Sequence, residues 1–281
     1  MPIIQWFPGH MAEAKRELRK TLASVDAVVE LIDARIPYAS TNPLLEELRN
    51  ERQRPVLKLL NKSDLADEKV TNEWLKFFST ESKKSIAISM NAKSKSRIGH
   101  VIDTCQKLAP HRDQSIKPLR IVITGVPNVG KSTLINSLIG QGKAKTADEP
   151  AVTRMISRYE TKEGTVIYDS PGVMWPKIKT SETGLYLAAH NAIGVNAYDN
   201  DDVAIFLVER ILVKYPDRLK TRYKLSSESK DSIACIEDIG RRLGLRSKGG
   251  GVDFSRTATF ILTDYRHGRF GRMTLQNLED L

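Results

Sequence analysis

The segment 119–139 constrains the fold more than any other part of the chain. An apolar run of strand length, Leu119–Thr124, precedes the loop GVPNVGKS (125–132), and a helical pattern covers Lys131–Ile139. The spacing G-x-x-x-x-G-K-S, placed between a strand and a helix, is typical of a loop that wraps a phosphate with backbone N–H groups. We therefore expect a strand, a phosphate-binding loop and a helix of an α/β domain.

Chemistry assigns a role to the polar groups of this loop. Lys131 extends a cation toward the outer phosphates of a nucleotide, and the Ser132 hydroxyl is a suitable ligand for Mg²⁺. The amino terminus of the helix adds positive potential at the same place. The candidate phosphate-binding residues form one run: Asn128, Val129, Gly130, Lys131, Ser132 and Thr133.

Strand and helix patterns alternate before this loop. Apolar runs of strand length cover 27–35, 54–64 and 85–90, and helical spacing covers 10–23, 43–50, 67–79 and 98–108. Such alternation predicts a doubly wound, mostly parallel α/β sheet with helices on both faces. After the loop, a pair of strands is expected at 156–160 and 165–168, around the turn at Glu163-Gly164.

Beyond residue 177 the strand patterns fade. Helical patterns take their place at 183–193, 201–214, 231–243 and 256–265. We therefore expect two domains, an α/β nucleotide-binding domain over 1–177 and an all-α domain over 178–281.

A second motif identifies the base. NKSD (61–64) stands at the carboxyl end of a predicted strand and matches the pattern by which GTPases recognise guanine. The Asp64 carboxylate can accept hydrogen bonds from both the guanine N1–H and the 2-amino group, which adenine cannot offer. Asn61 is expected at the other edge of the base and the Lys62 stem over the ring. With Ser63, these residues favour GTP over ATP.

Three further segments complete a nucleotide site. In DSPG (169–172), Asp169 is expected to hold Mg²⁺ through water, and the Gly172 N–H to face the γ-phosphate. Thr153 is the candidate second hydroxyl on Mg²⁺, in a loop that the γ-phosphate would order; an ordinary loop threonine is the alternative. A loose match to the loop that packs on guanine consists of Ser89, Met90, Asn91 and Ala92.

The order of these motifs is unusual. In ordinary GTPases the phosphate-binding loop comes first, whereas here NKSD and SMNAK precede it. A sheet tolerates such a circular permutation, because its strands need only be neighbours in space. The chain therefore leaves the DSPG segment and enters the helical region almost at once, so nucleotide state can bias the position of that region.

The charge balance favours a polyanionic partner. The chain has 44 Lys and Arg against 34 Asp and Glu, a net charge of +10 that is spread over its whole length. Its two cysteines exclude a disulfide framework, and the amino terminus lacks a signal-peptide pattern. No apolar run is long enough to span a membrane. We expect a cytoplasmic protein with no membrane partner.

Basic residues gather in two stretches of the helical region. In the first, KYPDRLKTRYK (214–224), they alternate with Tyr215 and Tyr223, a composition typical of RNA contacts. A solvated helix face is the alternative. The candidate RNA-binding residues are Lys214, Arg218, Lys220, Arg222, Lys224, Arg241, Arg242, Arg246 and Lys248.

Taken with these motifs, the chain resembles the circularly permuted GTPases of the ribosome biogenesis GTPase A family (YlqF type). The blocks that carry the resemblance are WFPGHMAEA (6–14), DARIPYASTNP (33–43), NKSD, GVPNVGKS, DSPGVMWP (169–176) and GGGVDFSRTATFILTDYRHGRFG (249–271). The resemblance implies an enzyme that hydrolyses GTP slowly, is stimulated by the large ribosomal subunit, binds its rRNA and acts late in its maturation. It also implies release or remodelling when GTP is hydrolysed. We expect the protein to be a monomer.

Catalysis needs a substitute for a missing side chain. Val173 stands where Ras-like enzymes have the glutamine that orients water. The resemblance implies that His10 positions water, with a helix-capping role as the alternative. Asn128 resembles the asparagine that helps to hold K⁺ in potassium-dependent GTPases. The candidate catalytic residues are His10, Asn128, Lys131, Thr153 and Gly172.

Two other readings stay open from the sequence. A small-molecule kinase or ATPase would use the same phosphate-binding loop, although NKSD argues against it. A non-catalytic scaffold would bind RNA and only sense GTP. Asp33 and Arg35 (DAR) either contact the nucleotide side or tie the strand end to its neighbours.

Overall fold

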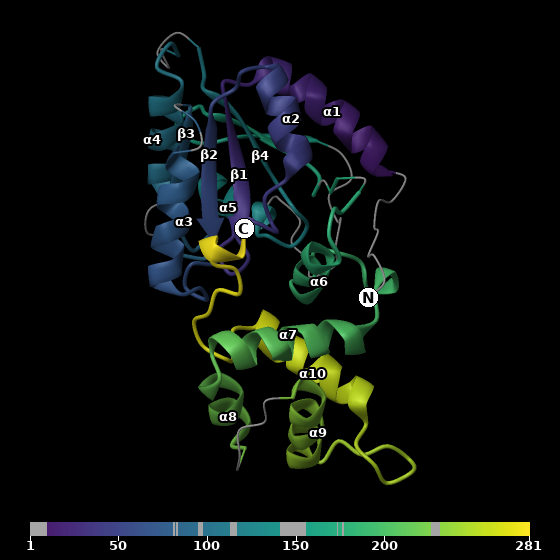
Figure 1. Cartoon of the computed structure of the whole chain (residues 1–281). Coiled ribbons are helices and arrows are strands. Elements are labelled where there is room, and N and C mark those ends of the chain that lie inside the picture. The colour runs from purple at the N-terminus through teal and green to yellow at the C-terminus, as the bar shows by residue number, and fades with distance from the viewer. Residues whose placement is uncertain are drawn as a thin grey trace.

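A computed structural model of the 281-residue chain describes residues 10–80, 82, 84–94, 98–112, 117–140, 156–172, 174–175, 177–225 and 231–281, with side chains from residue 12 onward. Its centre is a six-stranded sheet in the order β3-β2-β1-β4-β6-β5 (Figure 1). The strands are β1 (Ala27–Asp33), β2 (Val56–Asn61), β3 (Ser85–Ser89), β4 (Arg120–Gly125), β5 (Ser157–Glu160) and β6 (Val166–Asp169). All pairings are parallel except that of β5 with β6.

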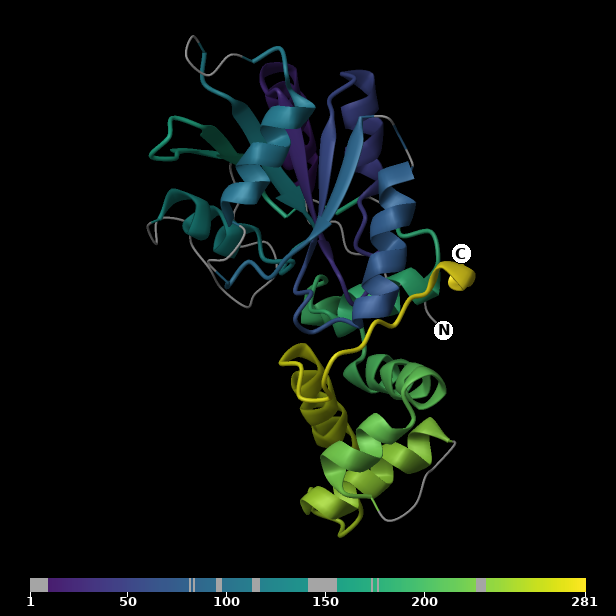
Figure 2. The same cartoon turned by 90° about the vertical axis from the view of Figure 1, so that its left-hand side faces the viewer.

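Helices cover both faces of the sheet (Figures 1 and 2). They are α1 (His10–Ser24), α2 (Pro43–Glu51), α3 (Glu68–Thr80), α4 (Ile98–Leu108) and α5 (Lys131–Ile139). Glu30 accepts a hydrogen bond from Asn42 N at the start of α2, and Lys58 lies over the ring of Phe78 in α3. Because Glu30 and Lys58 are register partners on β1 and β2, α2 and α3 share one face. Helix α4 contacts β1, β2 and α5.

The two central strands are buried along their full length, which explains their apolar sequences. Every residue of β1 and of β2 is buried. A strand enclosed on both faces needs apolar side chains at consecutive positions, and the runs AVVELID and VLKLLN provide them. The exceptions are two pairs of register partners, Glu30 with Lys58, and Asp33 with Asn61 at the carboxyl ends of the strands. Burial raises the pKa of the Glu30 carboxyl, and the Lys58 cation opposes that rise.

A group of helices lies below the sheet in Figure 1. It consists of α6 (Ser181–Ala189), α7 (Asn200–Lys214), α8 (Asp217–Tyr223), α9 (Ser232–Leu243) and α10 (Phe254–Arg266). The sequence predicted four of them, within a few residues at each end. It missed α8, because this helix lies inside the basic stretch that we interpreted as an RNA contact. An isolated β-bridge between Arg246 and Val252 lies in the connection between α9 and α10.

The C-terminal segment (272–281) does not stay with these helices. It returns to the α/β part of the chain and ends beside α3, near the end of β2 (Figure 1). There the Trp74 Nε1–H donates to the Gln276 carbonyl at 2.9 Å, and the Ala39 N–H donates to Gln276 Oε1, also at 2.9 Å. A division into 1–177 and 178–281 therefore stays a proposal, and this segment packs across it.

The described helices give one result on membranes. None of them combines the length and the apolar character that crossing a membrane requires. Both cysteines are buried free thiols.

Candidate nucleotide-binding site

The fold brings the predicted nucleotide motifs to one edge of the sheet. The DAR, NKSD and GVPNVGKS segments follow β1, β2 and β4, which are adjacent and parallel. Asp33 pairs with Asn61, and Leu31 pairs with Gly125, so these three strands end at about the same level. The carboxyl ends of parallel strands are where such sheets bind ligands.

The phosphate-binding loop needs special backbone geometry at its end. Gly130 caps α5 with a φ of 107°, a region that L-residues rarely adopt. A Cβ at this position would also collide with Asn61 Nδ2. The second glycine of the motif therefore permits both the turn into α5 and the close approach of Asn61.

Lys131 is folded back onto this loop. Its Nζ donates to the carbonyls of Gly125 and Val126, at 3.2 and 3.0 Å, and the side chain is buried. Burial lowers the pKa of Lys131 to about 8, and the Asp169 carboxylate opposes that shift. In this structure the Lys131 ammonium group binds backbone oxygens. We expect phosphate oxygens to take their place when a nucleotide is bound.

Asp169 is the carboxylate that best fits a divalent cation. It ends β6 and is buried, and its Oδ1 has no hydrogen-bond partner among the residues that the structure describes. Burial raises the pKa of Asp169 to about 6, against the opposing effect of Lys131. An orphaned buried oxygen, with the Ser132 hydroxyl in the first turn of α5, fits the hard oxygen ligands that Mg²⁺ prefers.

Asn61 joins three of the predicted motifs. Its Nδ2 donates to the Val129 carbonyl of the phosphate-binding loop at 2.7 Å. Its Oδ1 accepts a hydrogen bond from the Ala92 N–H at 2.8 Å. NKSD, GVPNVGKS and SMNAK therefore meet at one buried amide, which brings the loosest of the three sequence matches into the same site.

The other residues of NKSD extend from this point. Lys62 has a φ of 60°, and its Nζ donates to Asp33 Oδ2 and to the Asn128 carbonyl, both at 2.9 Å. Ser63 N–H donates to the Met90 carbonyl at 3.2 Å, a second link to the SMNAK loop. Asp64 is exposed. An exposed carboxylate beside this network is accessible to a base.

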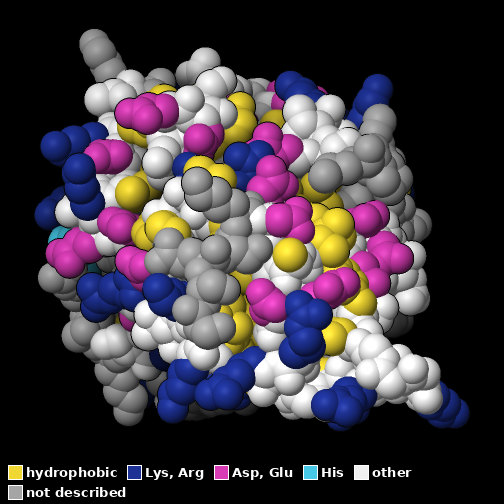
Figure 3. Space-filling model, turned by 60° about the horizontal axis from the view of Figure 1, so that its bottom comes forward, with side chains coloured by type: hydrophobic (Ala, Val, Ile, Leu, Met, Phe, Trp, Pro, Cys, Tyr) yellow, Lys and Arg dark blue, Asp and Glu magenta, His cyan; other side chains and the backbone are white. Residues whose placement is uncertain are grey.

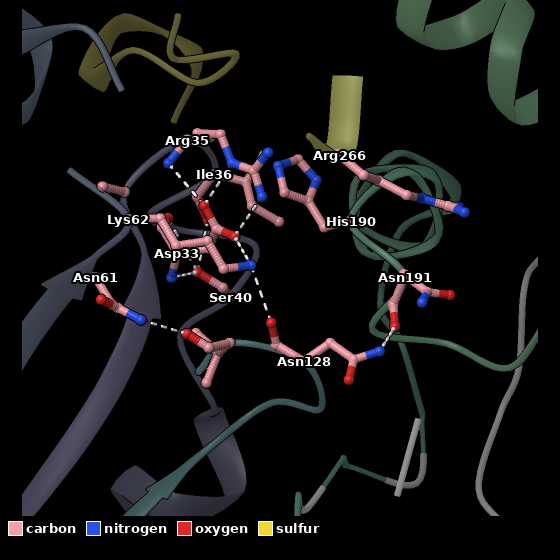
Figure 4. A network of polar contacts seen from close by, with 12 residues as sticks. Asp33, Arg35, Ile36, Ser40, Asn61, Lys62, Asn128, His190, Asn191 and Arg266 are labelled. Carbon is pink, nitrogen blue, oxygen red and sulfur yellow. Dashed lines mark hydrogen bonds and ion pairs between the residues drawn. The ribbon is translucent and has the colours of Figure 1, made fainter. Parts of the chain in front are cut away.

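Asp33 and Arg35 form a buried ion pair behind Lys62 (Figure 4). The distance from Arg35 Nη2 to Asp33 Oδ2 is 2.9 Å. The Arg35 and Lys62 cations hold the pKa of the Asp33 carboxyl well below its usual range, although burial opposes them. Arg35 Nη1 also donates to the Tyr265 carbonyl of α10 at 3.3 Å. Of the two roles considered for Asp33 and Arg35, these contacts favour the structural tie.

His190 and Tyr265 belong to the same network, and sequence reasoning did not connect them to the site. Tyr265 OH lies 2.7 Å from His190 Nε2, and His190 Nδ1 lies 2.8 Å from the Tyr186 carbonyl. A carbonyl only accepts, so Nδ1 carries the hydrogen and Nε2 accepts from the tyrosine hydroxyl. His190 lies in no motif, and Tyr265 lies in the block 249–271 but was given no role there. The two residues become neighbours of Arg35 only through the fold.

Asn128 reaches from the phosphate-binding loop to the helical region. Its Nδ2 donates to the Asn191 carbonyl at 2.7 Å, just after α6 (Figure 4). In this conformation the amide contacts the backbone after α6. Its predicted role toward K⁺ stays a prediction.

Several predicted residues lie outside the described part of the chain. They are Thr153, Val173 and the first nine residues, together with the side chain of His10. Helix α1 begins at His10. Gly172 is described and buried, and a Cβ there would lie 3.0 Å from Pro127 Cα, so the DSPG segment contacts the phosphate-binding loop closely.

The basic residues of the helical region divide into two groups. Of the candidate RNA-binding residues, three form ion pairs: Lys214 with Asp280, Arg222 with Asp264, and Arg241 with Asp238. Lys220 is half-buried. The exposed ones are Arg218, Lys224, Arg242, Arg246 and Lys248, together with the paired Arg241. Figure 3 shows basic and acidic side chains interspersed over this end of the molecule, with several Lys and Arg toward its lower edge.

The two tyrosines of the first basic stretch do not fit the interpretation that we gave them. Tyr223 is 4% exposed, and its hydroxyl donates to Asp264 Oδ2 at 3.2 Å. Tyr215 donates to the Thr274 carbonyl at 3.2 Å. Tyr223 faces inward from α8, whereas Tyr215 directly follows α7 and is half-buried. The interpretation of this stretch as an RNA contact was therefore wrong for the Tyr223 ring.

Comparison with known proteins places these features in one family. A family model described as a 50S ribosome-binding GTPase matches residues 120–237. Ribosome biogenesis GTPase A of Bacillus cereus is 36% identical over 285 aligned residues, covering 99% of this chain and 95% of the relative. The chain belongs to the ribosome biogenesis GTPase A family. It is therefore a GTPase, as its motifs predict.

Further comparisons agree with this assignment. Ribosome biogenesis GTPase A of Bacillus pumilus is 37% identical and is matched over 98% of this chain and 99% of its own length. The crystal structure of GNP-bound YlqF from Thermotoga maritima superposes with a TM-score of 0.65 at 26% identity, covering 96% of this chain and all of the other. The predicted α/β P-loop GTPase fold is confirmed.

Proposed function

We propose that this GTPase acts in the late maturation of the large ribosomal subunit, where it binds rRNA and is released or remodelled when GTP is hydrolysed. The names of its relatives support a role in ribosome biogenesis. The matched family model supports the large subunit as the partner. The site of action is then the cytoplasm.

One observation carries the nucleotide half of this proposal. The Asn61 amide donates to Val129 O and accepts from Ala92 N–H, at 2.7 and 2.8 Å. It thereby ties the base-reading motif to the phosphate-binding loop. One nucleotide can contact both motifs only if they are no farther apart than its base and its phosphates. The exposed Asp64 then discriminates guanine by its two acceptor oxygens.

The residues of the loop divide the work of hydrolysis. Lys131 leaves its backbone carbonyls and binds the outer phosphate oxygens, where its cation offsets developing negative charge. The N–H groups from Asn128 to Thr133 hold the phosphates, and the Gly172 N–H faces the γ-phosphate. Ser132, Thr153 and Asp169 would hold Mg²⁺, which when bound neutralises phosphate charge. His10 orients the attacking water.

The contact with rRNA is assigned to the exposed basic residues of the helical region. Lys224, Arg242, Arg246 and Lys248 are exposed and stand apart from the sheet, so they are accessible to a phosphate backbone. Arg222 and Lys214 are engaged by Asp264 and Asp280 and contribute less. The interspersed acidic side chains limit non-specific binding to other polyanions.

GTP turnover with and without purified large ribosomal subunits, in K⁺ against Na⁺, tests the proposal. We expect slow basal turnover and a clear stimulation by the subunit. Background turnover under all four conditions, with GTP and the subunit still bound, would instead establish a non-catalytic scaffold. Competition by ATP as effective as that by GTP would contradict the base assignment. Faster turnover in K⁺ would support the role given to Asn128.

A further inference from the structure

The loop that reads the base is held by the C-terminal segment (272–281). In the loop Ser63–Asp67, the Leu65 carbonyl accepts a hydrogen bond from the Met273 N–H at 3.0 Å. Two residues later, the Asp67 N–H donates to Thr274 Oγ1 at 3.1 Å. Both bonds lie within three residues of Asp64, the proposed guanine ligand.

Thr274 connects two of the loops at this edge of the sheet. Its side chain is fully buried, and its Oγ1 donates to the Ala34 carbonyl at 3.2 Å while accepting from Asp67 N. Ala34 follows β1 and precedes Arg35, and Asp67 follows NKSD. One hydroxyl therefore holds the DAR segment at a fixed distance from the base-reading loop.

Neighbouring residues keep the threonine in place. The Leu275 N–H donates to the Arg35 carbonyl at 2.8 Å, and the Thr274 N–H donates to Tyr215 OH at 3.0 Å. Tyr215 directly follows α7, so the anchor of Thr274 includes the helical region as well as the α/β part. The same hydroxyl of Tyr215 donates to the Thr274 carbonyl at 3.2 Å.

The residue after Asp64 also contacts the helical region. A Cβ added at Gly268, just after α10, would lie 2.5 Å from Leu65 Cδ2, so the two residues pack without spare space. Leu65 is thus fixed from two sides, by the Met273 N–H on its carbonyl and by the turn after α10 on its side chain. The Asp64 carboxylate stands on the turn closed by the Leu65 N–H and the Lys62 carbonyl at 2.9 Å.

We propose that the C-terminal segment, and Thr274 in particular, positions the base-reading loop, so that selectivity for guanine depends on the docking of this segment. Thr274 is a positioning residue, since it acts through the loop that carries Asp64. The Asp64 carboxylate must accept hydrogen bonds from the guanine N1–H and 2-amino group at the same time. If the loop is less well fixed, this bidentate interaction is the first to be lost. The inference rests on the proposed binding of GTP at this site.

Thr274→Val is the test, because valine keeps the shape of threonine and removes the hydroxyl. The dissociation constants of GTP and of inosine triphosphate, which lacks the 2-amino group, are measured by calorimetry. We expect Kd for GTP to rise about tenfold, as for the loss of one buried hydrogen bond, and Kd for the inosine nucleotide to rise less. The ratio between the two constants then falls.

Two control variants separate positioning from general damage. Thr274→Ser retains the hydroxyl and should restore the GTP preference. Glu279→Gln lies in the same segment at an exposed position and should leave both constants unchanged. Unchanged selectivity in Thr274→Val, or equal losses for both nucleotides with a lowered Tm, would overturn the inference. Failure of the unaltered protein to prefer GTP would instead contradict the proposed function.

A second measurement needs no variant. Coupling between two sites is reciprocal, so GTP should slow hydrogen exchange at the Asp67, Met273 and Leu275 amides of the full chain, whereas ATP should not. These amides are hydrogen-bonded across the segment contact, and their exchange reports its opening. Equal exchange with and without GTP would overturn the inference even if Thr274→Val did not fold.

Discussion

Single side chains at this site hold loops together by satisfying donors and acceptors on different strands. The nitrogen of Asn61 is committed to Val129 O and its oxygen to Ala92 N, which leaves Asp64 as the exposed group of the motif. Asn61 therefore holds the loops together, and Asp64 is left to recognise the base. We expect substitutions at Asp64 to change which base is bound more than whether the protein folds.

Asp64→Asn should shift the nucleotide preference from guanosine to xanthosine triphosphate. The asparagine amide donates a hydrogen bond to the xanthine 2-oxygen, where the carboxylate accepted one from the guanine 2-amino group. We expect a loss of about 10²-fold or more in relative affinity for GTP, as for a site whose polar match is broken. Competition binding with both nucleotides measures this change.

Asp67→Asn is the matched control, because its Oδ1 accepts from Lys69 N at the start of α3 and asparagine can do the same. It removes a nearby negative charge without altering the base-reading group. If the Asp64→Asn variant still prefers GTP, Asp64 is not the residue that recognises the base.

His190 predicts a loss of stability on acidification. Burial and the Arg35 cation lower the pKa of His190 to about 3, Lys62 acts in the same direction, and Asp33 opposes them. The unfolded chain, with an ordinary histidine, binds a proton below about pH 6.5. The folded chain binds it only near pH 3, so this contribution to stability is present above about pH 6.5 and falls as the pH drops through that window.

His190 alone is expected to contribute about 1.4 kcal/mol of unfolding free energy per pH unit below about pH 6, since its imidazole binds one extra proton on unfolding. Urea unfolding between pH 7 and pH 5 measures it, and His190→Gln is the comparison. The variant should be less stable at pH 7 but should lose less stability on acidification. Parallel curves would mean that folding does not lower the pKa of His190.

At the scale of elements, the strands bring the motifs to one edge of the sheet, and the short connections after the strands determine which motifs contact each other. Strands β1, β2 and β4 end together, so the sheet alone brings DAR, NKSD and GVPNVGKS to one edge. Helix α1 begins at His10, directly after the FPG residues of the amino-terminal block. His10, the proposed water-positioning residue, is therefore the first residue of a helix.

His10→Ala should lower the subunit-stimulated kcat by about 10²-fold or more, a range typical of losing a group that handles a proton or water. GTP affinity and subunit binding should stay close to those of the unaltered protein. Single-turnover hydrolysis on the subunit measures the effect. His100→Ala, at an exposed position of α4, is the control histidine.

Two other results would change this assignment. Equal losses of GTP binding and turnover in His10→Ala would favour the helix-capping role. An unchanged rate would leave a K⁺ site at Asn128 as the main catalytic element, and the dependence of kcat on K⁺ would then be steep.

At the scale of the molecule, a basic chain with scattered charge predicts electrostatic binding to RNA. Each phosphate contact that a Lys or Arg makes releases a counterion, so the association constant for the large subunit should fall steeply as salt rises. We expect Arg242→Gln and Lys248→Gln each to lower the slope of log K against log salt by about one. Lys162→Gln, an exposed lysine in the β5–β6 turn, is the control. A flat salt dependence would indicate contact with ribosomal proteins instead.

Much of the fold was predictable, because it depends on patterns that are local in sequence. Helices α4 and α5 have the predicted ends, and the strands differ by a few residues. The basic stretch 214–224 was harder. Leu219 and Tyr223 are the inward-facing residues of α8, four positions apart, but the surrounding Lys and Arg suggested a binding surface. The burial of Tyr223 against Asp264 and Phe270 is a property of packing.

The sequence by itself determined the nucleotide chemistry. G-x-x-x-x-G-K-S and N-K-x-D act through the backbone geometry and donor pattern of a few consecutive residues, and such properties are written locally. The permuted order was equally visible. The contacts of Arg35 with Tyr265, and of Thr274 with Ala34 and Asp67, join residues more than 200 positions apart. They exist because the C-terminal segment returns to the sheet, and burial of complementary donors and acceptors is decided only when the whole chain has packed.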